Sequence, residues 1–180
     1  MNTIKIGFSK PKKWKPFAWL IMAGYGISYD HVFIELYSTK YDRKMIYQAS
    51  GSKVNFMGYD LFHEGNVVVV EYEVSLQDEN YKKMMQFAID NSGRPYGIKQ
   101  AFGMAIVRLA EVLGRTIRNP FKDEGKTFVC SEMGAYILEN YAHVIISKEI
   151  DDITPKDLWS YFQSIPNGAQ AAQLPIQPSS

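Results

Sequence analysis

The chain has 180 residues, of which 46% are hydrophobic and 14% aromatic, and its 20 basic and 19 acidic residues leave a formal net charge of +1. This composition is typical of one globular domain with a substantial core, and it excludes an intrinsically disordered chain. The balanced charge also excludes the general positive field that drives nonspecific nucleic-acid binding. We therefore expect no nucleic-acid partner, and any role for charge must be local.

The start of the chain shows no targeting pattern. The stretch MNTIKIGFSKPKKW alternates like a strand where a secretory signal would need an uninterrupted apolar run. No apolar run reaches the roughly 18 residues of a membrane span. We therefore expect a soluble chain with no export signal of its own.

The first half of the chain has mainly the periodicity of strands. Residues 31–37 alternate strictly between apolar and other side chains, which predicts a strand that is buried on one face. The valine-rich run at 67–74 predicts a strand that is buried on both faces. The segment FAWLIMA, closed by Gly24 and Gly26, predicts a short helix with a glycine stop. Further strands are expected at residues 4–6 and 45–50.

The second half predicts helices, at about 78–92, 97–114 and 130–142. A last helix is expected to begin at Thr154-Pro155, because threonine can cap a helix and proline fits its first turn. The predicted fold class is therefore α+β, an antiparallel sheet packed with helices, over residues 1–165. Residues 166–180, which read PNGAQAAQLPIQPSS from Pro166, are predicted to form an extended low-complexity tail.

The only cysteine, Cys130, lies in the segment TFVCSEM. A single cysteine forms neither an internal disulfide nor a multi-cysteine metal site, so it is either inert packing or a reactive thiol. Cys130 opens a predicted helix, where unpaired N–H groups and the helix dipole favour the thiolate. The same N–H groups can stabilise an oxyanion. A buried structural cysteine stays open as the alternative.

Three histidines are candidates for a catalytic base. His63 lies in a predicted loop, and His143 lies just past a predicted helix end, where a cation is favourable. Both positions have ordinary structural explanations. His31 lies on the strand face opposite the apolar residues, so it is the preferred base, with a plain surface histidine as the alternative.

A thiol enzyme also needs a group that orients the imidazole. Glu35 shares the strand face of His31 but lies roughly 13 Å along the strand at about 3.3 Å per residue, which is too far for a hydrogen bond. A loop centred near residues 39–40 would place Gln48 opposite His31 on the next strand, with Cβ atoms roughly 5 Å apart. Gln48 is therefore the predicted third residue, and a register shifted by one residue stays open.

Several aromatic residues are candidates for substrate binding. Tyr25, Tyr29 and Tyr96, together with Trp14, have the amphipathic rings that line wet clefts, although core and rim positions are at least as common for them. We expect no metal and no other cofactor.

In chain order, these motifs resemble a known family. A YDHVFIEL strand, a strand ending in YQASG, a valine-rich strand, a helix running into GRPYG, then FVCSEMGAYIL and ITPKDLW cover about residues 4–160. This order is similar to the circularly permuted branch of the NlpC/P60 papain-like superfamily, in which the histidine precedes the cysteine. The resemblance implies a permuted NlpC/P60 fold with Cys130 as nucleophile, His31 as general base and Gln48 as polar third residue.

The resemblance also implies a function: a cysteine amidase or endopeptidase that cleaves peptide amide bonds of bacterial cell-wall peptidoglycan. One alternative is a thiol acyltransferase or lipase acting on lipid acyl groups, which the basic KPKKWKP beside FAWLIMA supports. Another is a non-catalytic virion structural protein that retains the fold. A cell-wall enzyme without a signal would reach its substrate in a phage virion, during phage lysis or through a dedicated secretion system. The tail is then the expected contact with a virion or assembly partner.

Overall fold

The computed structural model describes residues 2–51, 53–112, 114–115, 117, 120 and 127–165, so the predicted tail at 166–180 lies outside the described residues. An antiparallel five-stranded sheet has the order β4-β3-β2-β1-β5. The strands are β1 (Asn2–Pro11), β2 (His31–Ser38), β3 (Arg43–Ser50), β4 (Lys53–Gly58) and β5 (Asn66–Leu76). The helices are α1 (Pro16–Tyr25), α2 (Tyr59–Gly65), α3 (Asp78–Asn91), α4 (Ile98–Val112), α5 (Cys130–Ala142) and α6 (Pro155–Ser164). The α+β class is thus confirmed.

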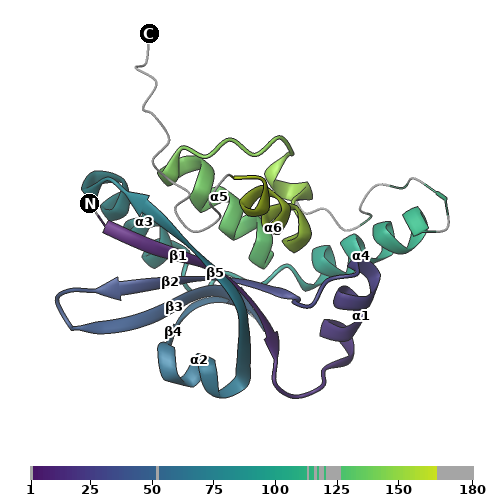
Figure 1. The fold of residues 1–180 in the computed structure, drawn as a ribbon, viewed down its shortest axis with the longest axis horizontal. Coiled ribbons are helices and arrows are strands. Elements are labelled where there is room, and N and C mark those ends of the chain that lie inside the picture. The colour runs from purple at the N-terminus through teal and green to yellow at the C-terminus, as the bar shows by residue number, and fades with distance from the viewer. Residues whose placement is uncertain are drawn as a thin grey trace, which may run out of the picture.

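Helices cover both faces of the sheet. Figure 1 shows α5 and α6 on one side, α2 on the other, and α1 beside α4 at one end of the molecule. The main core lies between the sheet and α5, where Val32, Ile34 and Leu36 of β2 are fully or almost fully buried. A second, smaller core of Phe33, Ile46 and Phe62 lies on the α2 side.

The second core corrects the prediction that the strand at 31–37 is half-buried. Phe33 is fully buried, because Phe62 of α2 packs against it with ring centroids 4.6 Å apart. The Phe33 ring also lies over Gly7 of β1, where an added Cβ would come within 2.1 Å of the ring. Both faces of β2 are therefore buried, and a helix distant in sequence causes the difference.

The valine-rich strand also differs from its prediction. β5 lies at the edge of the sheet and pairs only with β1 among the described strands. Val67 is 40% exposed, and Val68 to Val70 are partly buried. Burial on both faces was the wrong prediction, because an edge strand has no neighbour to cover its outer side.

Three elements were not predicted: β4, α2 and a short 3₁₀ helix, η1 (Ile150–Asp152). β4 pairs along the whole of its length with β3. α2 places His63 in a helix rather than in the predicted loop, with its ring tilted by 49° against that of Tyr59 at a centroid distance of 4.1 Å. A helix of seven residues has little stability alone, so the burial of Phe62 in the second core is what stabilises it.

The helices of the second half were predicted well. α3, α4 and α5 begin and end within two residues of the predicted bounds. At the start of α6 the Thr154 hydroxyl accepts a hydrogen bond from the Asp157 backbone N–H at 3.3 Å, while the Asp157 carboxylate accepts from the Thr154 N–H at 2.8 Å. These reciprocal bonds form a capping box and confirm the predicted helix start.

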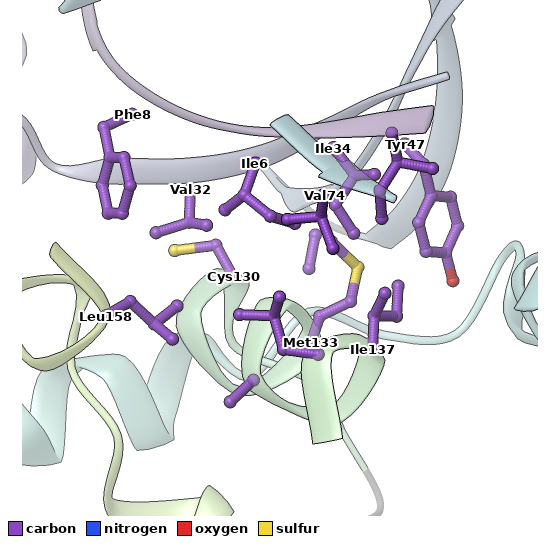
Figure 2. Packing of buried hydrophobic residues seen from close by; sticks show 14 of the residues in the cluster. Ile6, Phe8, Val32, Ile34, Tyr47, Val74, Cys130, Met133, Ile137 and Leu158 are labelled. Atoms are coloured by element: carbon purple, nitrogen blue, oxygen red, sulfur yellow. The ribbon is translucent and has the colours of Figure 1, made fainter. Parts of the chain in front are cut away.

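Close packing of α5 on the sheet fixes where its first residue lies. A Cβ added at Gly134 would come within 3.2 Å of both Val32 and Leu158, so glycine allows this close approach without displacing either side chain. Figure 2 shows Cys130 and Met133 of α5 facing the strands, with Leu158 of α6 beside them. The start of α5 is therefore held directly against the start of β2.

Candidate active site

His31 and Gln48 form a direct contact. The His31 Nε2 atom lies 2.8 Å from the Gln48 Oε1 atom. The Gln48 amide nitrogen lies 3.5 Å from the sulfur of Met57. A thioether sulfur is a weak acceptor, so it favours the amide N–H group over the amide oxygen at this position. Since Gln48 presents its oxygen to the ring, His31 carries its proton on Nε2 and leaves Nδ1 as the basic atom.

The register that creates this contact differs from the prediction. β2 and β3 pair Ile34 with Tyr47 and Ser38 with Arg43, two residues away from the expected pairing. A shift of two keeps every side chain on its predicted face, because side chains alternate with a period of two. Gln48 therefore still reaches His31, diagonally rather than from directly opposite.

Burial controls the charge of His31. Desolvation lowers the pKa of the imidazole to about 4, although the hydrogen bond with Gln48 acts in the opposite direction. The imidazole is therefore neutral at pH 7, which is the form that accepts a proton as a general base.

Cys130 is the first residue of α5, as predicted, and it is 2% exposed. Its sulfur points toward Val32 (Figure 2). Burial raises the pKa of the thiol to about 11, and hydrogen bonds from the backbone N–H groups of Val32 and Ser131 only partly oppose this. The expectation that the helix N-terminus favours the thiolate is therefore reversed, because desolvation of the buried sulfur outweighs the nearby N–H groups.

The thiol and the imidazole lie at the same end of β2. Val32, whose N–H group faces the sulfur, directly follows His31 in the chain. Among the described residues no hydrogen bond joins the His31 ring to Cys130; the ring instead lies on the side of Gln48 and Phe62. Because neighbouring side chains of a strand point to opposite faces of the sheet, the His31 ring lies on the α2 face and the Cys130 sulfur on the α5 face, and the two do not form a catalytic pair in this structure.

Two further polar groups surround Cys130. Tyr96 is half-buried; burial, the charge of Cys130 and a hydrogen bond to Cys130 raise the pKa of its hydroxyl. Burial raises the pKa of Asp30 to about 6, and its Oδ1 atom is buried without a hydrogen-bond partner in the described structure. Asp30 is therefore mostly ionised at pH 7, and its negative charge contributes to the raised pKa of the Cys130 thiol.

The three predicted substrate-binding tyrosines have different positions. Tyr96 lies at Cys130, as a site residue would. Tyr29 is 2% exposed and stacks on Trp159 at a centroid distance of 4.4 Å, so it is a core residue and does not line an open cleft. Tyr25 donates a hydrogen bond to the Met104 backbone oxygen at 3.3 Å and thereby joins α1 to α4. For Tyr25 and Tyr29 the structure gives a packing role instead.

Sequence reasoning overlooked a buried acid beside the nucleophile. Glu132, 3% exposed, accepts hydrogen bonds from the Val129 N–H at 3.1 Å and from the side chain of Gln100. Glu132 occupies the N3 position of α5 and satisfies the N–H group of the N-cap residue Val129; because valine has no side-chain acceptor, the sequence lacks the signature of a capping box. Glu35 was correctly set aside, because it pairs with Lys44 at 2.9 Å.

The fold and the site define an α+β protein with a histidine–glutamine pair on one face of β2 and a buried cysteine that begins a helix on the other face. A scan against protein-family models finds no matching family, and a search of curated proteins finds no matching relative. The resemblance to the permuted NlpC/P60 branch therefore rests on the order of the sequence motifs.

Proposed function

We propose that the protein is a cysteine hydrolase that cleaves peptide amide bonds of bacterial cell-wall peptidoglycan. Cys130 is the nucleophile, His31 the general base, and Gln48 the residue that orients His31. The observation that carries the proposal is the 2.8 Å contact between His31 Nε2 and Gln48 Oε1, which directs the proton of the ring away from its basic Nδ1 atom.

The chemistry starts from neutral groups. The His31 ring must first turn toward the Cys130 sulfur when substrate binds, because it rests on the other face of the sheet. As the sulfur then attacks the carbonyl carbon, the thiol proton passes to His31 Nδ1, and the carbonyl electron pair moves onto oxygen. Backbone N–H groups in the first turn of α5 stabilise that oxyanion. Collapse breaks the C–N bond, the leaving amine takes the proton from His31, and water then cleaves the thioester in a second round of general-base catalysis.

A second candidate, a thiol acyltransferase or lipase, is supported by the basic segment before α1. Burial is the main cause of the low pKa of His31, and the positive charge of Lys15 lowers it further. Lys15 thus lies within electrostatic reach of the candidate base. A cation in that position suits an anionic lipid substrate as well as an acidic peptide.

A comparison of substrates tests the proposed function. Wild-type protein incubated with purified peptidoglycan fragments should release new primary amino groups, and it should release no fatty acid from phospholipid vesicles. Amine release is followed with an amine-reactive dye, and fatty acid by chromatography. Release of fatty acid without amine would establish the lipid acyl hydrolase in place of the amidase.

The role of Gln48 is tested by replacing it with glutamate. A carboxylate at this contact favours the imidazolium, so Gln48→Glu should raise the pKa of His31 by about 1–3 units. Activity should be preserved or increased, whereas Gln48→Ala should lose activity by about tenfold or more because the tautomer is no longer fixed. The pKa is measured by NMR titration and compared with the acid limb of the pH–rate profile.

The exposed Gln163→Glu change on α6 is the matched control, since it adds the same charge away from the site. It should leave both the His31 pKa and the activity unchanged. If Gln48→Glu reduced activity as strongly as Gln48→Ala, the orienting role would be wrong.

A further inference from the structure

The outer face of α1 is apolar and exposed. Pro16, Trp19, Leu20 and Ala23 recur at helical spacing, and all four are exposed, Trp19 by 55% and Leu20 by 43%. Residues at this spacing share one face of a helix. In most surface helices such an apolar face points into the core. Here α1 packs beside α4 (Figure 1), and the exposure of the four residues shows that the apolar stripe faces outward.

Exposed cations border this stripe at the start of α1. Lys12, Lys13 and Lys15 are all exposed, and Trp14 between them is 74% exposed. A tryptophan with 74% of its surface exposed adds little to the core. Tryptophan and lysine together are instead the residues that favour the boundary between water and lipid, where the ring can lie among headgroups and the ammonium groups meet phosphate.

Cations also lie at the end of α1. Arg108 Nε donates to the backbone oxygen of Gly24 at 3.2 Å, and Lys156 Nζ donates to that of Tyr25 at 3.2 Å. These groups match the negative end of the helix dipole. The apolar stripe is thus flanked by positive charge at both ends. α1 itself, PFAWLIMAGY, contains no charged residue.

We propose that this docking face, formed by residues 12–15 and the exposed stripe of α1, binds the surface of an anionic phospholipid bilayer. Trp14, Trp19 and Leu20 enter the interfacial layer, and the lysines contact the lipid phosphates. Binding is peripheral, and among the described residues no helix is both long and apolar enough to cross a membrane.

The charge argues for lipid over a protein partner. The cores of protein–protein interfaces are depleted of lysine, because burial of an ammonium group is costly there. At an anionic bilayer each surface lysine adds favourable attraction while its head group stays hydrated. Three lysines directly beside the apolar stripe therefore fit a bilayer surface better than a second protein.

The docking face adjoins the candidate active site. Burial raises the pKa of Asp30, and the charge of Lys15 opposes this rise, so Lys15 lies near Asp30 as well as near His31. A protein bound through this face would hold the start of β2 close to the bilayer. The proposal goes beyond the proposed hydrolase activity and does not depend on it.

Vesicle flotation tests the docking face. Wild-type protein should float with vesicles of phosphatidylcholine containing phosphatidylglycerol, and its partition coefficient should be at least tenfold lower for pure phosphatidylcholine. Raising the salt concentration should weaken binding, because exposed charges are screened. The variants Trp19→Ser/Leu20→Ser and Lys12→Glu/Lys13→Glu should each bind the anionic vesicles at least tenfold more weakly than wild type.

Matched controls change exposed residues elsewhere. Ile145→Ser removes an apolar side chain that is 88% exposed, and Lys82→Glu reverses an exposed charge on α3. Both should float like wild type. Far-UV circular dichroism and thermal unfolding verify that every variant is folded. Cys130→Ser should also bind normally, which separates a failure of the docking face from a failure of the proposed catalysis.

Three results would overturn the proposal. The first is equal flotation of wild type and both docking-face variants, and the second is no flotation of any of them. The third is a wild-type dimer in sedimentation analysis that Trp19→Ser/Leu20→Ser dissociates, with no binding to vesicles; the face would then be an interface between copies of the chain. Quenching of tryptophan fluorescence by brominated lipid, lost in Trp14→Phe/Trp19→Phe, would support the predicted insertion.

Discussion

Replacement of Cys130 by serine is expected to lower the rate of amine release from peptidoglycan fragments by about 10³-fold or more. A serine hydroxyl holds its proton far more tightly than a thiol does, and His31, with a pKa of about 4, is a weak base. No second cysteine in the chain can take over the role. The measurement is the initial rate at pH 7 for wild-type and variant proteins at equal concentration.

Trapping of the acyl-enzyme tests whether Cys130 itself carries the acyl group. Mass spectrometry of wild-type protein quenched during turnover should show an acyl adduct on the peptide containing Cys130, and Cys130→Ser should show no such thioester. Cys130→Ala serves as the control for packing, since both variants should melt within a few degrees of wild type if the fold is kept. Retention of more than a tenth of the wild-type rate by Cys130→Ser would exclude Cys130 as nucleophile.

Alkylation of Cys130 by iodoacetamide at pH 7 should be about 100-fold slower than alkylation of a free cysteine, because the thiolate reacts and burial raises the thiol pKa from 9.0 to about 11. The rate should rise about tenfold per pH unit toward pH 11, whereas a free thiol reaches its plateau near pH 9. The measurement is adduct formation followed by mass spectrometry across this range.

The raised pKa of the Cys130 thiol also makes the free energy of unfolding depend on pH. The folded state holds the thiol proton more tightly than the unfolded state, so this contribution is present below about pH 9 and is lost as pH rises toward about 11. Protein unfolded in guanidinium is the matched control and should be alkylated like a free cysteine. Fast labelling of the folded protein at pH 7 would mean that the helix N-terminus outweighs burial, as the sequence alone suggested.

The sequence determined features that depend on neighbours in the chain. Thr154, Pro155 and Asp157 define the start of α6 because capping uses only adjacent residues. The start of α5 at Cys130 and the faces of β2 and β3 follow from local periodicity. The contact between His31 and Gln48 was predicted for the same reason, and it tolerated an error of two in register because the faces were right.

Features that depend on contacts between distant segments could not be predicted from local periodicity. The burial of Phe33 requires α2, and the exposure of Val67 follows from the edge position of β5, neither of which periodicity contains. The pKa of Cys130 likewise depends on segments that are distant in the sequence. A cysteine at a helix N-terminus has a lowered pKa in water-accessible sites, yet β2 and α6 enclose Cys130 and raise it, since desolvation depends on every residue that surrounds the sulfur.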